Sequence, residues 1–352
     1  MTARPIGYYV HHHGDGHRQR ALAIAARAQG RITVLGTGLA GRTGAIPCID
    51  LPDDRLEPRE FDGRDASARR PDALHYAPVD HDGIRRRIAL ITDWIAAARP
   101  ALMVVDVSAE VAMLARLASV PTVYVRLSGR RDDAPHREAF RGATALLSPF
   151  HALLDDDATP AELRTRTIYA PGLGERPDPA VPEPHRILGV VGRGGAPIDV
   201  RRWAAAAAAT PDWSWTVIGD GPMSADGPPN LRFAGWVGDA TAQIARAGVV
   251  VGAAGDGLVG TVLAARRPFI CVPEDRPFDE QRSKAARLAA LGAAVVCPTW
   301  PVAEQWPTLL DQARAIDPAL LASFDDPIGA ARAAARLCAV ADAAGTQPVA
   351  SA

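Results

Sequence analysis

Residues Gly252–Gln281, GAAGDGLVGTVLAARRPFICVPEDRPFDEQ, predict a ligand site at the edge of a parallel sheet. The stretch reads as a glycine turn, a helix, a buried strand and a proline-containing loop that ends at Glu280 and Gln281. A helix N-terminus favours an anion, because its free N–H groups and its dipole of about half a charge point outward. A carboxylate and an amide beside it can bind sugar hydroxyls. The pattern therefore indicates a nucleotide-sugar site.

Length and composition favour two α/β domains in a cytoplasmic protein. The chain has 352 residues, of which 48% are hydrophobic, and its net charge of -1 gives no overall basic field for nucleic acid. Its four cysteines show no C-x-x-C spacing, which disfavours a zinc knuckle or redox pair and fits a reducing cytoplasm. The first strand starts without an apolar signal region, and no apolar run reaches about 18 residues. We expect no membrane span, with peripheral membrane contact left open.

Short apolar strands alternate with Ala- and Arg-rich helices, which is typical of doubly wound domains with parallel sheets. We expect a first Rossmann-like domain at 1–168, a proline-rich linker at 169–185, a second domain at 186–326, and a terminal helix and tail at 327–352. In the first domain we expect strands at 5–10, 31–35, 101–105, 121–125 and 143–147, and helices at 18–29, 82–98 and 109–118. In the second we expect strands at 186–191, 214–218, 231–234, 249–252, 269–272 and 294–297, and helices at 201–209, 241–247, 258–265 and 280–291. Ligands of such folds lie at the carboxyl ends of the strands.

The stretch 252–281 resembles the donor-binding half of the GT-B glycosyltransferases. It is similar to the branch that contains the peptidoglycan N-acetylglucosaminyltransferase and the bacterial natural-product glycosyltransferases. The resemblance implies an α/β GT-B fold with a cleft between two Rossmann-like domains. Glu280 and Gln281 match the Asp/Glu-Gln pair that contacts the donor sugar in that family. Two positions depart from the pattern: Ala253 stands where the family often has a histidine, and Thr261 where it usually has a glutamate that holds the ribose.

The resemblance also implies a set of donor-binding residues. The glycine turn would contact the diphosphate, a loop after the first strand of the second domain would offer N–H groups to phosphate, and a segment near 235 would pair with the base through its main chain. By this resemblance, the residues expected to bind the donor are Gly192, Arg193, Gly194, Gly235, Trp236, Val237, Gly255, Asp256, Gly257, Thr261, Glu280 and Gln281. Ordinary βα loops, and a strand end with one packed Trp, are the competing interpretations of the loop and base segments.

His17 is the candidate general base, because a histidine at the mouth of the first domain can accept a proton near neutral pH. In many GT-B enzymes a Gly-His at this turn has that role, and His17 matches it. Asp106 ends a buried strand and matches an aspartate that orients the histidine in that family. A capping or phosphate-contacting role for His17 remains an alternative, as does a helix N-cap role for Asp106, for which Ser108 competes.

Several further polar residues are weaker candidates. His13, Asp15, Arg126 and His136 are expected on the acceptor side of the cleft, without a spacing that fixes their roles. The literal G-x-G-x-x-G at Gly36–Gly41 is not expected to bind a dinucleotide, because Gly44 and Pro47 break the helix that would have to follow. The aspartates at 155–157 are interpreted as a helix-start cluster, and no metal site is expected.

The sequence thus predicts an inverting, metal-independent glycosyltransferase that uses a nucleotide sugar, with UDP or dTDP as the nucleotide. Its partners would be that small-molecule donor and an unidentified hydroxyl acceptor, and no cofactor is expected. A related epimerase acting on the 2-position of a nucleotide sugar and a non-catalytic nucleotide-sugar binding protein remain the alternatives.

Overall fold

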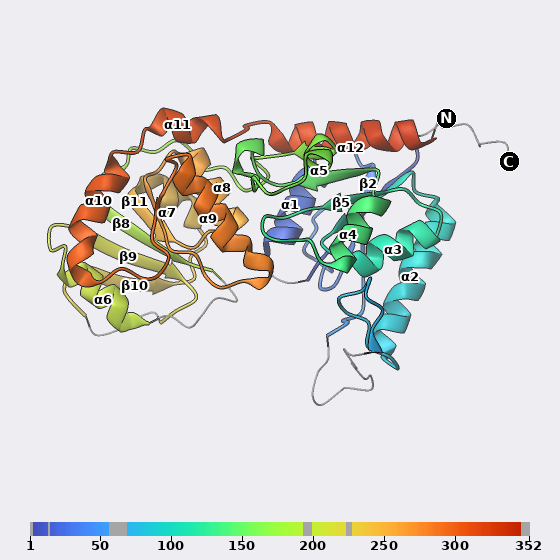
Figure 1. The fold of residues 1–352 in the computed structure, drawn as a ribbon, viewed down its shortest axis with the longest axis horizontal. Helices are drawn as coiled ribbons and strands as arrows, with labels where there is room; N and C mark the ends of the chain where they lie inside the picture. Colours follow the sequence, from blue (N-terminus) through green and yellow to red (C-terminus); the bar gives the residue numbers. More distant parts are fainter. Residues whose placement is uncertain (1–2, 13–14, 56–68, 193–198, 223–226, 346–352) are drawn as a thin grey trace.

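The computed structural model describes residues 3–12, 15–55, 69–192, 199–222 and 227–345. Within these residues the chain forms two separate sheets, one in each half of the molecule (Figure 1). The first sheet has seven strands in the order β3-β2-β1-β4-β5-β6-β7, and the second has six in the order β10-β9-β8-β11-β12-β13. Each strand pair is parallel. This is the doubly wound α/β architecture that the sequence predicts.

The first half contains the following elements. Its strands are β1 (Ile6–Val10), β2 (Ile32–Gly36), β3 (Cys48–Asp50), β4 (Leu102–Asp106), β5 (Thr122–Val125), β6 (Ala145–Ser148) and β7 (Thr167–Tyr169). Its helices are α1 (Asp15–Ala25), α2 (Asp82–Ala98), α3 (Ala109–Leu117), α4 (Ala134–Gly142) and α5 (Ala161–Thr165), with a short 3₁₀ turn at Ala152–Leu154.

The second half repeats the plan. Its strands are β8 (Glu183–Val191), β9 (Ser214–Gly219), β10 (Leu231–Gly235), β11 (Ala247–Gly252), β12 (Phe269–Cys271) and β13 (Val295–Val296). Its helices are α6 (Val200–Ala208), α7 (Ala240–Arg246), α8 (Asp256–Ala265), α9 (Glu280–Ala290), α10 (Trp306–Arg314) and α11 (Pro318–Ser323), with 3₁₀ turns at Pro277–Asp279 and Ala303–Gln305. The final helix is α12 (Gly329–Gly345).

Helix α1 differs from its predicted bounds at both ends. It begins at Asp15, before the predicted start, so that His17 lies in its first turn. It ends at Ala25, and the chain then turns through left-handed backbone at Gln29 and Gly30 before β2. Helix α2 occupies the predicted range. The chain passes between the sheets at residues 170–182, within the stretch that the sequence marks as a linker.

Apolar side chains cover both faces of each sheet, as parallel strands require. Strand β4 shows the pattern plainly, because all five of its residues are buried, Asp106 included. One core of the first half joins β1, β2 and β4 to α1, and another joins the opposite face to α2, α3 and α4. The second sheet is sandwiched in the same way. Two rigid scaffolds therefore present the strand ends from which the candidate site is built.

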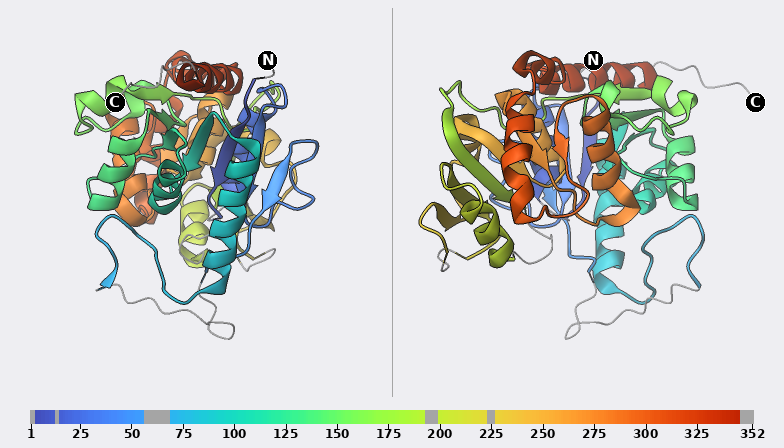
Figure 2. Two further views of the ribbon diagram at one scale, coloured as in Figure 1. Left: turned by 90° about the vertical axis from the view of Figure 1, so that its right-hand side faces the viewer. Right: turned by 60° about the vertical axis from the view of Figure 1, so that its left-hand side comes forward.

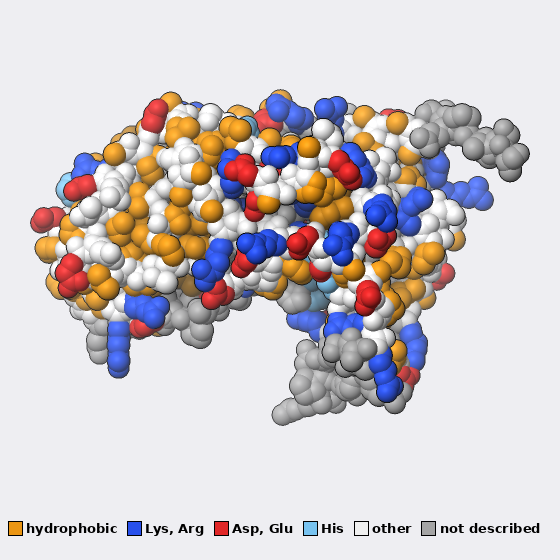
Figure 3. Space-filling model, viewed as in Figure 1, with side chains coloured by type: hydrophobic (Ala, Val, Ile, Leu, Met, Phe, Trp, Pro, Cys, Tyr) orange, Lys and Arg blue, Asp and Glu red, His pale blue; other side chains and the backbone are white. Residues whose placement is uncertain are grey.

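Helix α12 follows the second half in sequence but packs against the first. Its Leu337, Ala333 and Ala341 are buried in the core that also contains β1, β4 and α1. Figure 1 shows α12 in red along the first half, and the views in Figure 2 agree. The sequence predicts a terminal helix but not this return. The chain thus joins the two halves twice, and Figure 3 shows the surface hollowed between them. Among the described residues, none of the helices combines the length and apolar character that a membrane crossing needs.

Candidate functional site at the facing strand ends

The order of the strands places one switch point in each sheet. In the first sheet the chain order reverses between β1 and β4, and in the second between β8 and β11. The carboxyl ends of the strands beside such a point diverge, which is where doubly wound folds bind ligands. His17 follows β1, Asp106 ends β4, and the turn before α8 follows β11. The main predicted groups of both halves therefore lie at these two points.

His17 and Asp106 are in contact. The Nδ1 atom of His17 lies 3.0 Å from Oδ1 of Asp106, and the side chain of His17 is 15% exposed. Asp106 is fully buried. Burial alone would raise the pKa of the Asp106 carboxyl, but Arg20 and then His17 lower it to about 2. The aspartate is therefore ionised beside the imidazole near neutral pH.

Arg20 is a third member of this cluster, which the sequence analysis missed. Its Nε and Nη2 atoms donate to the two oxygens of Asp106 at 3.0 and 3.3 Å. Its Nη2 atom also lies 2.8 Å from Nδ1 of His17. The side chain is buried, and Asp106 raises the pKa of the guanidinium although burial lowers it. The available signal was the spacing, since residues three apart on a helix share a face.

The cluster continues into the second half. Nη1 of Arg20 lies 3.9 Å from Oδ2 of Asp256, the first residue of α8. Asp256 also forms an ion pair with Lys284 of α9, whose side chain is buried. Lys284 is the only lysine of the chain, which was a signal in the sequence that pointed to no role by itself. Alternating charges thus run from His17 to the N-terminus of α8.

The glycine turn before α8 is open on its outer side. A Cβ atom added to Gly255 or Gly257 would meet no atom within 4 Å, and the same holds for Gly192 at the end of β8. The turn that leads into α8 therefore has open space beside its glycines, as a ligand approaching a helix N-terminus needs. Thr261 lies one turn further along, but its hydroxyl donates to the carbonyl of Gly257 at 2.9 Å. The glycines of the turn are thus open on one side, whereas the Thr261 hydroxyl already has a partner.

Glu280 and Gln281 both have partners within the protein. Gln281 is 5% exposed, and its Oε1 accepts from the backbone N–H groups of Ala254 and Glu274 at 3.2 and 2.9 Å. It ties the glycine turn to the loop after β12. Glu280 accepts from Arg131 of the first half at 2.9 Å. The pair thus fixes the glycine turn and bridges the two halves of the structure.

The remaining residues predicted to bind the donor are placed as follows. Gly235 ends β10 with φ +61°, and Trp236 after it is 55% exposed, while Val237 packs against a core cluster. Gly192 is exposed. Arg193 and Gly194 lie outside the described residues, as does His13 on the acceptor side.

The acceptor-side candidates do not converge on one place. Arg126 is buried and forms a two-pronged ion pair with Asp155 at 2.9 and 2.6 Å. Asp15 pairs with Arg18 on its own helix at 2.5 Å. His136 is buried beneath Phe278, with ring centroids 4.7 Å apart. Arg126 and His136 therefore face internal partners, because burial of a charged or polar group demands them.

His136 belongs to a compact cluster with His75 and Asp133. The possible ligand atoms of these three residues lie within 4.8 Å of one another, close enough to consider a metal ion. However, Nε2 of His136 faces a guanidinium N–H of Arg131 at 3.1 Å, and its Nδ1 lies 2.5 Å from Asp133. Because Arg131 can only donate, Nε2 must accept, and Nδ1–H then donates to Asp133. A metal on Nδ1 would require a proton on Nε2, against Arg131, so the contacts favour a hydrogen-bonded cluster.

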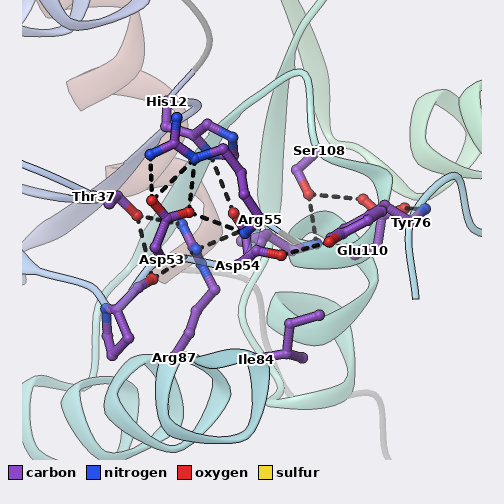
Figure 4. Close-up of polar contacts among 12 residues, drawn as sticks. His12, Thr37, Asp53, Asp54, Arg55, Tyr76, Ile84, Arg87, Ser108 and Glu110 are labelled. Carbon is purple, nitrogen blue, oxygen red and sulfur yellow. Dashed lines mark hydrogen bonds and ion pairs between the residues drawn. The ribbon is translucent and has the colours of Figure 1, made fainter. Parts of the chain in front are cut away.

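A cavity of about 400 Å³ lies beside the His17–Asp106 pair. Apolar side chains of α2 and α3 form part of its wall, and Figure 4 shows polar groups that line it as well. Arg87 pairs with Asp54 at 2.9 Å, and Asp54 lies 3.3 Å from Nδ1 of His12. His11 also lines the cavity, and its ring lies 5.8 Å from that of His17. Sequence reasoning missed these residues, since they come from three separate segments.

Comparisons with known proteins agree with the architecture. No protein-family model matches the sequence, and neither does any of the curated proteins. Solved structures do match over nearly the whole chain. The glycosyltransferase SnogD from Streptomyces nogalater has a TM-score of 0.64 and 17% identity, with 96% of this chain and 99% of that chain covered. MurG of Acinetobacter baumannii has a TM-score of 0.60 and 18% identity, with 96% and 99% covered.

The spinosyn rhamnosyltransferase SpnG complexed with thymidine diphosphate is also similar, at a TM-score of 0.58 and 17% identity, with 96% of each chain covered. Because similarity extends across both halves and the linker in all three, it concerns the whole architecture and not one Rossmann-like unit alone. This chain therefore has the GT-B fold of these glycosyltransferases.

Proposed function

We propose that this protein is a glycosyltransferase that moves a sugar from a nucleotide-sugar donor to a hydroxyl acceptor. The observation that carries the proposal is the His17–Asp106 pair and its link to the other half. Arg20, which contacts this pair, also approaches Asp256 at the N-terminus of α8. A general base and an anion site are the two parts that such a transfer needs, and here they come from opposite halves. The likeness to solved glycosyltransferases over both halves supports the same conclusion.

The proposed chemistry is direct displacement with inversion. Nε2 of His17 takes the proton of the acceptor hydroxyl as its oxygen attacks the anomeric carbon, and the bond to the diphosphate breaks. In this tautomer Nδ1–H donates to Asp106, which stabilises the imidazolium as it forms. The N–H groups at the N-terminus of α8 would stabilise the departing diphosphate, so the proposal requires no divalent metal.

Each half has its own substrate in this proposal. The half formed by residues 186–326 binds the donor, with UDP or dTDP as the nucleotide, and the complex of SpnG with thymidine diphosphate supports a nucleotide of this kind. Gly192, the segment 235–237 and the turn at 255–257 line its side. The half formed by residues 1–168 binds the acceptor. The cavity beside His11 is large and mainly apolar, which favours an apolar acceptor that presents one hydroxyl to His17.

A non-catalytic nucleotide-sugar binding protein is the second candidate. It is favoured by the contacts of Glu280 and Gln281, whose side chains bind Arg131 and two backbone N–H groups. If these contacts persist with a donor bound, neither the carboxylate of Glu280 nor the amide oxygen of Gln281 is fully available to the sugar. Binding without any transfer would distinguish this candidate.

The test has a binding stage and a transfer stage. Thermal unfolding with UDP, dTDP, GDP and CDP should show a rise in Tm with one of them, because a ligand of the folded state stabilises it. With the matching sugar donors and a panel of apolar alcohols, transfer should be detected by mass spectrometry. His17→Ala should lower transfer by about 10²–10⁴-fold and leave the nucleotide-induced shift in place. The exposed His185 offers a control, and His185→Ala should change neither.

Retained transfer in His17→Ala would contradict the base assignment. A nucleotide shift without transfer to any alcohol would favour the binding protein, and the absence of a shift with all four nucleotides would contradict the donor site.

A further inference from the structure

Arg20 lies at the centre of the charged cluster and touches more of it than any other side chain described above. It is one helical turn after His17 and is 6% exposed. Its guanidinium reaches both oxygens of Asp106, Nδ1 of His17 and, at 3.9 Å, Asp256. A planar group with several fixed donors can serve these partners at once, which an ammonium group cannot do in the same geometry.

The charges around His17 come from several elements. Asp106 approaches from β4 and Arg20 from α1, both at Nδ1. The ring of His11 lies 5.8 Å away at the end of β1. Tyr8 of β1 is buried close to Asp106 and Arg20, and burial together with Asp106 raises its pKa, so that it stays neutral. Asp256 and Lys284 lie on the far side of Arg20 and neutralise each other.

A buried aspartate next to a histidine has two opposite effects on a general base. It orients the imidazole, but it also favours the protonated ring, which can accept no proton. The negative charge of Asp106 therefore works against proton abstraction unless another group offsets it. Arg20 opposes this effect, because the positive charge of its guanidinium, with Nη2 2.8 Å from Nδ1, repels the positive charge of an imidazolium.

We propose that Arg20 is a positioning residue that keeps His17 neutral by offsetting the charge of Asp106, while fixing the carboxylate that orients the imidazole. The inference rests on the proposed function in one respect: a neutral His17 matters for catalysis only if His17 is the base that takes the acceptor proton. Its physical content concerns only the protonation of His17. It can therefore be tested without a donor or an acceptor.

The experiment is a pH titration of the histidine rings by NMR on isotopically labelled protein. The signal of His17 is assigned by its loss in His17→Gln. In Arg20→Gln the titration midpoint of His17 should rise by about 1–3 pH units, the effect of one charge at this distance. Arg20→Lys keeps the charge and should stay closer to the wild-type midpoint. A purely structural role for Arg20 would not predict this order.

Arg20→Gln leaves a buried carboxylate without its main partner and can fail to fold. A second comparison covers that case, in which Asp106→Asn is measured against Asp106→Asn combined with Arg20→Gln. With the carboxylate gone, Arg20 is unopposed, so the single variant should titrate at lower pH than the double variant, again by about 1–3 units.

An unchanged midpoint in both comparisons would overturn the proposal, whatever a transfer assay gives. A shifted midpoint in a protein that transfers no sugar would count against the proposed function alone, and would support the link between Arg20 and His17. If transfer is found, the rising limb of kcat against pH in Arg20→Gln should move in the same direction as the midpoint.

Discussion

His136 is the residue at which protonation most clearly opposes folding. Burial, reinforced by the nearby Arg131, lowers the pKa of its imidazole from 6.5 to about 4. Between these values the unfolded chain takes up a proton that the folded protein does not. Stability is therefore fully present above pH 6.5 and is lost as the pH falls toward 4. At about 1.4 kcal/mol per pH unit, the loss amounts to about 3 kcal/mol.

Urea unfolding at pH 4.5, 5.5, 6.5 and 7.5 checks this prediction. We expect His136→Gln to be less stable than the wild type at pH 7.5, because it loses hydrogen bonds, but to lose less stability on acidification. The exposed His185 provides the control, and His185→Gln should keep the full pH dependence. Equal slopes in the wild type and His136→Gln would show that another group is responsible.

The contact between His17 and Asp106 could be predicted from the sequence, whereas the roles of Arg20 and Lys284 could not. Both residues follow strands that are neighbours at a switch point, so strand order alone brings them close. Arg20 and Lys284 acquire their roles through Asp106 and Asp256, which are 86 and 28 residues distant. Gln281 shows the same limit, since its hydrogen bonds to Ala254 and Glu274 depend on burial that no local pattern encodes.

At the scale of elements, a backbone hydrogen bond helps to hold the segment before α9 against the first half. Phe278 and Asp279 both have left-handed backbone, with φ of 63° and 52°, a conformation that costs non-glycine residues energy. The carbonyl of Phe278 accepts from the N–H of Arg130 at 2.7 Å, and the Phe278 ring lies 5.0 Å from the guanidinium of Arg131. Contacts with the first half thus hold this strained turn in place.

Gly129 is the position on which this contact depends. Its φ is +97°, and a Cβ atom there would overlap the carbonyl oxygen of Phe278. We expect Gly129→Ala to lower the free energy of unfolding by about 1–3 kcal/mol and to speed hydrogen exchange at Arg130. Gly142 at the end of α4 is the matched control, because a Cβ atom there would meet nothing within 4 Å. A Gly129→Ala protein as stable as Gly142→Ala would contradict this account of the interface.

Elements with strong local patterns were predictable, and those held by tertiary contacts were not. Helix α2 has an amphipathic repeat and begins and ends where the sequence indicates. Strand β3 has three residues and lies at the edge of its sheet. So short a strand shows too little alternation of apolar and polar residues to be recognised in the sequence. Helix α4 has Pro135 in its first turn and contains two arginines. It is too short for its amphipathic repeat to be recognised in the sequence.

At the scale of the whole molecule, α12 determines how the two halves depend on each other. It completes a core of the first half with residues that follow the second half in sequence, so the first half lacks part of its core without α12. The sequence shows an alanine-rich helix here, but the surface that it covers is set by the path of the chain after α11. Destabilising α12 should therefore affect the first sheet before the second.

Leu337→Ala tests this dependence, because Leu337 is fully buried between α12 and the first sheet. Truncating a buried leucine costs about 2–5 kcal/mol, through lost apolar contact and the cavity that remains. We expect faster hydrogen exchange in β1 and β4, with β11 and β12 little changed. Arg336, on the exposed side of the same helix, is the control, and Arg336→Ala should stay within about 0.5 kcal/mol of the wild type. Equal loss of protection in both sheets would mean that the halves unfold as one cooperative unit, and protection lost only in the second sheet would contradict the placement of α12.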